Sequence, residues 1–373
     1  MEQKHKYKTW CTVNTDNLVH NYLYTKEKAN NRVICVVKAD GYGHGAAEIA
    51  KKLMEAGCDF FAVSSFHEAK ELRDAGIDCG ILVLGRILPC EIEQAVSLDI
   101  SLAAGTVDFI TDIIRNNTSD KKARIHIKLN TGMNRTGFDA IHYNKTSELE
   151  KALALINENE EIFDVEGVFS HFAKAEDDED FSLIQFERFM NAVAFIENHG
   201  IIPKIRHISN SAGSLNYPDF RLDAVRLGIY LYGCETDDEN YLPVMSFHSR
   251  ILEIKELEKG DGVGYGLDFT ADKNMRIAIV GAGYADGVFR SLSNGKGYVT
   301  CAGTKCPIVG RVCMDMLMID TSHIDSIKPF DTVTIFGYGS GGFIPCSVQA
   351  KNAGTISYEL LCAVSKRVPR LYI

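Results

Sequence analysis

Two kinds of segment, strand-like and helix-like, alternate along the first part of the chain, up to about residue 235. This alternation constrains the fold more than any other feature of the sequence. Short apolar or β-branched runs are followed by stretches with helical spacing, such as Gly45–Gly57 and Phe66–Gly76, each closed by a glycine. A third helix is predicted over Asn17–Lys28, after a Thr15-Asp16 start. Buried strands that alternate with amphipathic helices indicate a parallel sheet covered by helices.

Eight such strand runs are present, and eight favours a closed (β/α)8 TIM-type barrel over an open doubly wound sheet. The predicted strands are Val33–Val37, Phe60–Val63, Ile81–Leu84, Ile100–Ala103, Arg124–Leu129, Val165–Phe169, Ile205–Ile208 and Val225–Leu231.

The sequence pattern changes after residue 240. Short segments in which apolar and polar residues alternate are separated there by Gly and Asp turns, a pattern typical of an antiparallel β domain. These segments are Arg250–Leu257, Arg276–Gly281, Lys296–Cys301, Lys305–Val312, Met316–Asp320 and Thr332–Phe336. We therefore predict a barrel domain over residues 10–240 and a mostly β domain over residues 241–373, with segment 1–9 as a candidate to pack on the second domain.

Composition excludes several classes of function. The formal net charge of -10 argues against a sequence-independent grip on nucleic acid, which needs clustered Lys and Arg. No window approaches the roughly 20 apolar residues of a membrane helix, and the start Met1–Lys8 lacks a secretory pattern. The 11 cysteines contain no C-x-x-C pair, so we expect reduced thiols in a cytoplasmic protein without a bound metal.

Two local patterns could be mistaken for ligand sites. The acidic run Glu176–Asp180 lacks the glycine and the spacing of a calcium loop, so we interpret it as a solvated acidic loop. The glycine-rich stretch Gly337–Gly342 is not followed by a helix pattern, so we predict a hairpin turn there and not a dinucleotide site.

Lys38 is the first candidate for chemistry. In a parallel barrel the active-site groups lie at the carboxyl ends of the strands, and Lys38 directly follows Val36-Val37. An apolar surround lowers the pKa of a lysine and suits it to form a Schiff base. An ion pair with Asp40 at the barrel rim is the alternative, and position alone does not decide between them.

Other polar residues follow four further strands. Asn130–Arg135 comes after the fifth run, Ser170-His171 ends the sixth, the seventh leads into His207–Gly213, and the eighth contains Arg226–Ile229. A serine followed by small residues, together with glycine amides, is typical of a phosphate monoester site. An isolated His171 or His207 is more often a core histidine, but the joint placement of these groups at the strand ends indicates a common site.

Segments over nearly the whole chain resemble the alanine racemase family, in the family's order. The first is VVKADGYGHG at Val36–Gly45, where the family's lysine carries the cofactor. The others are KLNTGMNRTGF (Lys128–Phe138), FSHF (Phe169–Phe172), HISNSAG (His207–Gly213), AVRLGIYLYG (Ala224–Gly233), VGYG (Val263–Gly266), GYADG (Gly283–Gly287), GRVCMDM (Gly310–Met316) and TISYE (Thr355–Glu359).

The resemblance implies a (β/α)8 barrel followed by a mostly β domain, and a homodimer with shared active sites. It implies interconversion of L-alanine and D-alanine with pyridoxal 5′-phosphate, which supplies D-alanine for peptidoglycan precursors. Two positions depart from the family: Asn130 stands where an Asp is common, and Thr12 stands where a Glu is common. Asn130 puts a local hydrogen bond in doubt, and we attach no consequence to Thr12.

The resemblance also implies roles for individual residues. Lys38 would carry the cofactor and act as one catalytic base, and Tyr265 of the partner subunit would be the second. Arg226 would face the pyridine nitrogen with His171 behind it. Arg135 would help to hold cofactor and substrate, and Lys128 beside it is carbamylated in many relatives. The phosphate would be surrounded by Tyr42, Ser211, Gly228, Ile229 and Tyr358, and the substrate entrance would be lined by Met314 and Tyr284, with Asp315 and Arg311 nearby.

Arg226 leads to a hypothesis about reaction specificity. A guanidinium has only donors and keeps its proton in a protein, so it should leave the pyridine nitrogen of the cofactor unprotonated. Less negative charge would then spread into the ring, which should suppress transamination.

Three rival functions share parts of this pattern. A basic-amino-acid decarboxylase uses the same scaffold, but Tyr265 and the GRVCMDM segment favour a racemase. A non-catalytic cofactor carrier built from the barrel alone would lack the second domain and the second base. A racemase for serine or for a broader set of amino acids is the third, because pockets discriminate weakly against one added oxygen, although Tyr358 and Met314 would crowd a side chain larger than methyl.

Overall fold

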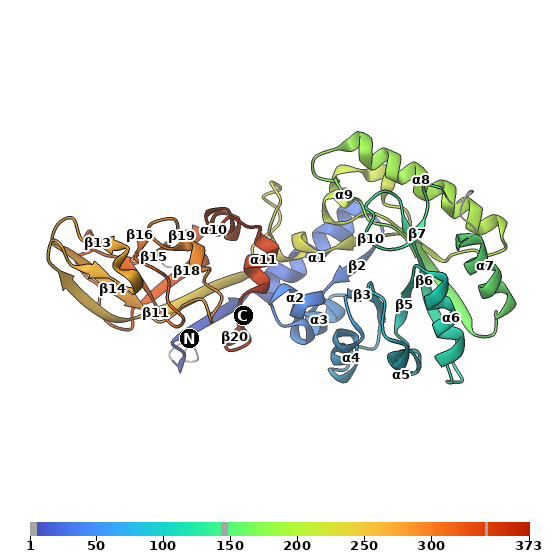
Figure 1. Cartoon of the computed structure of the whole chain (residues 1–373), viewed down its shortest axis with the longest axis horizontal. Coiled ribbons are helices and arrows are strands. Elements are labelled where there is room, and N and C mark those ends of the chain that lie inside the picture. Colours follow the sequence, from blue (N-terminus) through green and yellow to red (C-terminus); the bar gives the residue numbers. More distant parts are fainter. Residues whose placement is uncertain (1–5, 143–147, 340–341) are drawn as a thin grey trace. The chain divides into compact units, whose positions relative to one another are not determined.

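The structure is a computed structural model that describes residues 6–142, 148–339 and 342–373. The chain forms two compact units (Figure 1). The barrel unit comprises residues 19–41 and 46–231, and the β unit comprises residues 1–18, 42–45 and 232–373. In the part of the chain that the structure describes, no helix is long and apolar enough to cross a membrane.

The barrel unit contains a parallel nine-stranded sheet, in which the two-residue β7 (Phe138–Asp139) pairs with β6 alone and the other eight strands follow the order β10-β2-β3-β4-β5-β6-β8-β9. Backbone hydrogen bonds link its two ends, because the amides of Arg226 and Asp223 donate to the carbonyls of Ser209 and Arg206 at 3.0 and 3.1 Å. These eight strands are β2 (Arg32–Val36), β3 (Phe60–Val63), β4 (Gly80–Val83), β5 (Ser101–Ala104), β6 (Ala123–Asn130), β8 (Phe163–Phe169), β9 (Ile205–His207) and β10 (Ala224–Leu227).

Each of these strands overlaps one of the eight predicted runs, which confirms the predicted barrel class. The eighth run was predicted too long: β10 ends at Leu227, and a 3-10 turn, η4 (Ile229–Tyr232), follows after Gly228. Helices lie outside the strands (Figure 1): α1 (Thr15–Ala29), α3 (Ala46–Glu55), α4 (Phe66–Asp74), α5 (Ile92–Ser97), α6 (Val107–Asn116), α7 (Glu148–Glu158), α8 (Glu179–Asn198) and the short α9 (Ser211–Asn216).

The acidic run at Glu176–Asp180 is only partly a loop. Asp178 is the N-cap of α8, and its side chain accepts a hydrogen bond of 2.9 Å from the Phe181 amide. Glu179 and Asp180 then occupy the first turn, where carboxylates favour the positive end of the helix. The prediction of a loop was therefore wrong for these last residues, because the run is a helix start. Among the described residues, no group of three or more His, Cys, Asp or Glu side chains is arranged to hold a metal ion.

The β unit is built on a nine-stranded sheet in the order β19-β18-β15-β16-β17-β14-β11-β1-β20. The strand pairs described in this sheet are antiparallel, except that β1 pairs with β20 in parallel. The strands are β1 (Thr9–Val13), β11 (Met245–Leu257), β14 (Met275–Val280), β15 (Tyr298–Cys301), β16 (Thr304–Val309), β17 (Leu317–Asp320), β18 (Thr332–Gly339), β19 (Gly342–Ile344) and β20 (Arg370–Tyr372).

This unit confirms the mostly β character predicted for the second part of the chain, and it adds elements that the sequence pattern did not predict. Strand β11 begins at Met245, five residues before the predicted Arg250. Two helices, α10 (Cys346–Ala353) and α11 (Ser357–Cys362), follow the last predicted strand. The strands β18 and β19 pair as a hairpin, and residues 340–341 of its predicted turn lie outside the described residues.

Candidate active site

Lys38 lies where the first barrel strand gives way to a left-handed turn. It begins α2 (Lys38–Tyr42), in which Ala39, Asp40 and Gly41 have φ of 53°, 55° and 62°. This conformation costs roughly 1–2 kcal/mol for a residue with a side chain, so the surrounding structure must hold it. The Gly41 amide donates to the Val37 carbonyl at 2.8 Å, and the Asp40 carboxylate accepts the Ala46 amide at 2.9 Å.

Cations gather around the half-buried Lys128 and His171. Burial first, and then the charges of Arg135, Arg226 and Lys38, lower the pKa of Lys128 to about 8. Burial and the same positive groups, with Lys128 added, hold the pKa of His171 well below its usual range. The carboxyl ends of β2, β6, β8 and β10 therefore form a strongly positive region, which favours an anionic ligand.

Arg226, on β10, is 3% exposed and is held by hydrogen bonds at both terminal nitrogens. Nη1 donates to His207 Nδ1 at 2.8 Å and to the His207 carbonyl at 3.2 Å. Nη2 donates to the carbonyls of Ser170 and Ile208 at 2.7 and 2.9 Å, and to His171 Nδ1 at 3.0 Å. Within the described part of the chain, no acceptor meets Nε, so this N–H is the donor that the protein leaves for a ligand.

Burial and the charge of Arg135 lower the pKa of Arg226 to about 9, which still leaves the guanidinium charged at neutral pH. A hydrogen bond from a guanidinium requires a bare acceptor. The nitrogen Nδ1 of His171 therefore carries no proton, and His171 is a neutral imidazole whose proton is on Nε2. His171 therefore lies against Arg226 as a neutral hydrogen-bond acceptor.

Ser211 and Gly228 meet at the carboxyl ends of β9 and β10. The Gly228 amide donates to Ser211 Oγ at 2.9 Å, and both residues are buried. The side chain of Asn210 caps α9 by accepting the Gly213 amide at 3.0 Å. Ile229 follows Gly228 directly and is also buried. Ser211, Gly228 and Ile229, which the family resemblance assigns to one phosphate site, therefore lie together on the barrel unit.

The two predicted phosphate tyrosines both belong to the β unit, where their rings approach each other. Tyr42 and Tyr358 have ring centroids 6.0 Å apart, with Tyr358 on α11. Burial raises the pKa of Tyr42, so its hydroxyl keeps its proton and can donate to an anion.

Tyr265 is the first residue of the 3-10 turn η5 (Tyr265–Leu267) in the β unit, and 70% of its surface is exposed. Met314 and Tyr284 are 53% and 44% exposed. Backbone hydrogen bonds of 3.0 Å, from Tyr284 to Cys313 and from Ala285 to Met314, hold these two predicted entrance residues side by side. Asp315, next to Met314, accepts a hydrogen bond of 2.7 Å from Arg367.

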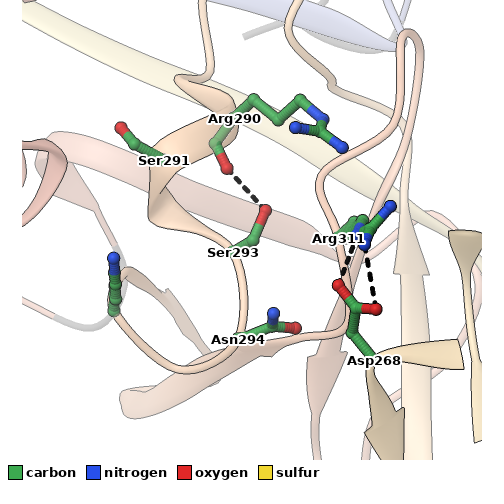
Figure 2. Close-up of a pocket in the computed structure, with 7 residues that line it drawn as sticks. Asp268, Arg290, Ser291, Ser293, Asn294 and Arg311 are labelled. Atoms are coloured by element: carbon green, nitrogen blue, oxygen red, sulfur yellow. Dashed lines mark hydrogen bonds and ion pairs between the residues drawn. The ribbon is translucent and has the colours of Figure 1, made fainter. Parts of the chain in front are cut away.

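Figure 2 shows a pocket that adjoins η5. The Arg311 guanidinium donates twice to the Asp268 carboxylate, and the second hydrogen bond measures 2.9 Å. Asp268 directly follows η5, so this ion pair joins the turn that carries Tyr265 to the segment before Met314. The rest of the lining is polar: Arg290, Ser291, Ser293, Asn294 and Lys296. Sequence reasoning named Arg311 but missed Asp268 and Arg290.

The structure also adds residues inside the barrel that sequence reasoning missed. Ser101, His126 and Glu166 form hydrogen bonds that lead to His207, one of the two histidines that the sequence singled out. A signal was present in β6, where Arg124, His126 and Lys128 alternate with apolar residues and so lie on one face of the strand.

Comparisons with known proteins agree with this geometry. Residues 13–236 match the family described as alanine racemase, N-terminal domain, and residues 244–372 match alanine racemase, C-terminal domain. The chain belongs to the alanine racemase family. Within this family, alanine racemase 1 of Oceanobacillus iheyensis is 40% identical, and the match covers 98% of each chain. The alanine racemase of Clostridium tetani is 39% identical over 99% of this chain and 96% of that protein.

Solved structures of the family have the same fold. The alanine racemase of Bacillus anthracis with bound L-Ala-P superposes with a TM-score of 0.91 at 32% identity, over 98% of this chain and 95% of that one. The alanine racemase of Clostridium difficile 630 gives a TM-score of 0.91 at 34% identity, over 99% and 96%. The family assignment and the two-part fold that the motifs implied are therefore confirmed.

Proposed function

We propose that this chain interconverts L-alanine and D-alanine with pyridoxal 5′-phosphate, with Lys38 and the partner subunit's Tyr265 as the two bases. The observation that carries the proposal is the setting of Arg226. It is a buried guanidinium with both terminal nitrogens occupied and one N–H left over, at the barrel mouth that also holds Lys38. Membership of the alanine racemase family supplies the substrate.

The residues present fit the cofactor. Its phosphate would be held by Ser211, Gly228 and Ile229 on the barrel unit. The family resemblance adds Tyr42 and Tyr358 to the residues that would surround it. Its ring nitrogen is an acceptor and would face the Nε–H of Arg226. When bound, the cofactor supplies an electron sink that stabilises negative charge on the substrate's α-carbon.

Residues of the chain itself would then remove the substrate's α-proton and return a proton to the α-carbon. Lys38 would take or return the α-proton on one face of the substrate, and the partner's Tyr265 would do so on the other face. Arg135, one of the cations of the positive region, would hold the substrate carboxylate. Met314 and Tyr284 would limit the size of the side chain that enters, which favours methyl.

The exposure of the second base supports a homodimer with shared sites. Tyr265 is 70% exposed in its own unit, whereas a base must be held in position to act. Two further exposed side chains, Met314 and Tyr284, belong to the same unit. We propose that a second copy covers them, that the protein works in the cytoplasm, and that its D-alanine serves peptidoglycan precursors. The division into domains 10–240 and 241–373 is part of the same proposal.

The test is an absorbance spectrum combined with a racemisation assay over several L-amino acids. The purified protein should show an absorbance band at about 420 nm, typical of the cofactor bound to a lysine, and should convert L-alanine to D-alanine. Lys38→Ala should lose both, whereas Lys52→Ala, on the exposed face of α3, should keep both. A band that persists in Lys38→Ala, or carbon dioxide release from a basic amino acid, would overturn the proposal.

A further inference from the structure

Five polar side chains from five different strands form one chain of hydrogen bonds inside the barrel. Ser101 on β5 donates to Glu166 Oε2 on β8 at 2.5 Å. Glu166 Oε2 lies 3.0 Å from His126 Nε2 on β6, and His126 Nδ1 lies 2.9 Å from His207 Nε2 on β9. His207 Nδ1 accepts from Arg226 on β10 at 2.8 Å. We call Ser101, Glu166, His126, His207 and Arg226 the relay.

The protons of the relay can be placed in only one way. Arg226 donates, so His207 Nδ1 is bare and His207 carries its proton on Nε2. That proton points to His126 Nδ1, which must also be bare, so His126 carries its proton on Nε2. Glu166 accepts it as a carboxylate. Both imidazoles are therefore neutral, and they lie between the Arg226 cation on one side and the Glu166 anion on the other.

The charge state of Glu166 agrees with this assignment. Burial raises the pKa of its carboxyl, but the hydrogen bonds from His126 and Ser101 outweigh this effect and lower the pKa to about 2. Burial, and then the charge of Arg226, hold the pKa of His207 well below its usual range. A carboxylate and a neutral imidazole are thus the forms present at neutral pH.

The residues of the barrel interior leave room for the relay and pack against it. Barrel interiors are mostly filled by branched apolar side chains, and a buried polar group destabilises the fold unless it is fully paired. Here both histidines are completely buried, and Phe169 stacks on His207 with ring centroids 5.0 Å apart. A Cβ on Gly167 would lie 2.4 Å from His126 Nδ1, so the glycine leaves the space that this ring occupies.

We propose that Glu166 is the buried counter-ion of Arg226, acting through His126 and His207, and that the relay fixes the direction and the charge of the guanidinium that would face the cofactor ring. Glu166, His126 and His207 are positioning residues, because only Arg226 would touch the cofactor. The effect on the loaded site rests on the proposed function, whereas the proton arrangement of the relay does not.

The first test uses the protein without cofactor and therefore does not depend on the proposed activity. In ¹⁵N-histidine spectra, His126 and His207 should both appear as neutral imidazoles protonated on Nε2. Glu166→Gln keeps an acceptor oxygen but removes the charge, so it should shift the Nε2 resonance of His207, two hydrogen bonds away.

Asp223→Asn is the matched control. It neutralises the Asp223 carboxylate, which accepts a hydrogen bond of 2.7 Å from Arg206. Arg206 is the residue before His207, and this ion pair is not part of the relay. Its effect on the His207 resonance should be small compared with that of Glu166→Gln. If Glu166→Gln does not fold, Ser101→Ala serves instead, because it removes only a donor to Glu166 and should shift the same resonance by less.

The second test uses the loaded enzyme. Glu166→Gln should lower kcat for racemisation on the order of tenfold with little change in KM, and should raise the yield of the amine form of the cofactor per turnover. A merely structural role would lower thermal stability without changing that yield. A His207 protonated on Nδ1, or equal resonance shifts in Glu166→Gln and Asp223→Asn, would overturn the proposal even if the protein racemises alanine.

Discussion

The Glu68 carboxylate on α4 accepts a hydrogen bond of 2.7 Å from the amide of Ala39, the residue that follows Lys38. Its other oxygen accepts the amides of Ser64 and Ser65 at 2.7 and 3.3 Å, as part of the capping box at the start of α4. One side chain therefore caps a helix and also holds the left-handed turn that aims Lys38. A capping box joins residues within one helix start, and here its carboxylate also contacts the turn that follows the neighbouring strand β2.

Glu68→Ala should therefore affect both stability and activity. Loss of the capping box and of the contact with Ala39 should destabilise the fold by about 1–2 kcal/mol and lower kcat. The measurement is the free energy of unfolding in urea together with the racemisation rate. Glu71→Ala, an exposed change on the same helix, is the control and should alter neither by a comparable amount. Equal losses in the two variants would contradict the role given to Glu68.

Much of this region could be predicted from the sequence, because the strand ends follow from short-range patterns. The lysine after Val36-Val37 and the serine after β9 were placed correctly by the rule that barrel sites lie at the carboxyl ends of strands. The left-handed conformation of Ala39 was not predictable from residue type, since alanine, unlike the following Asp40, does not favour positive φ. One of the contacts that hold it comes from Glu68, which is 29 residues away from Ala39 in the sequence.

Gly137 closes the loop that carries Arg135, and it has no room for a side chain. Its φ is +116°, and a Cβ there would lie 2.8 Å from the Leu129 carbonyl carbon and 2.9 Å from the Asn130 amide nitrogen. Gly200 also has a positive φ, +84°, but no atom lies within 4 Å of the corresponding Cβ position.

The two glycines can therefore separate backbone strain from steric overlap. Gly200→Ala should cost about 1 kcal/mol of stability, from backbone strain alone. Gly137→Ala should cost about 1–3 kcal/mol more and should raise KM for alanine, since it shifts the Arg135 loop. Thermal unfolding and steady-state kinetics of both variants measure these effects. Similar losses in the two variants would mean that the Gly137 contact relaxes freely.

Arg226 sets the expected partition between racemisation and transamination. Arg226→Glu replaces a donor by a group that favours a protonated pyridine nitrogen, so racemisation should fall and the amine form of the cofactor should accumulate. The measurement is the ratio of amine form to D-alanine produced over many turnovers. Arg206→Gln, a change on the neighbouring strand whose partner is Asp223, should leave that ratio as in the wild type. An unchanged ratio in Arg226→Glu would refute the hypothesis.

The hydrogen bonds of the relay could not be predicted from the sequence. His207 was considered as an isolated histidine, for which a satisfied core role is the more common outcome. Its partners lie 81 and 19 residues away in the sequence, so only the closure of the barrel brings them together. The polar face of β6 was a local signal, but it does not say which strand faces it. Pairing across a barrel is a tertiary property, and the apolar patterns that identify strands carry no information about it.

Stability should fall in mild acid because His171 and His207 are held neutral. For a base whose pKa is lower in the folded protein than in the unfolded chain, protons bind the unfolded chain first. The unfolded chain therefore gains stability as the pH drops below about 6.5, by up to about 1.4 kcal/mol per pH unit for each such histidine.

The midpoint of thermal unfolding of the cofactor-free protein should thus decrease between about pH 7.5 and about pH 5.5. His171→Gln should reduce this decrease, because one neutral buried imidazole is gone. His67→Gln changes a histidine whose side chain is 84% exposed and should keep the full decrease. If His171→Gln shows the same pH dependence as the wild type, the linkage to His171 is wrong.

Tyr265 offers the sharpest test of a shared site. If each active site combines Lys38 of one subunit with Tyr265 of the other, Lys38→Ala and Tyr265→Ala chains should each be inactive alone. Refolded together in equal amounts, they should recover about a quarter of the wild-type activity, because half of the dimers are mixed and each mixed dimer contains one intact site. Mixing Lys38→Ala with a Lys38→Ala/Tyr265→Ala double variant is the control and should stay inactive, since every site then lacks Lys38. Absence of recovery in a mixture shown to contain mixed dimers would place Tyr265 and Lys38 of the same chain in one site.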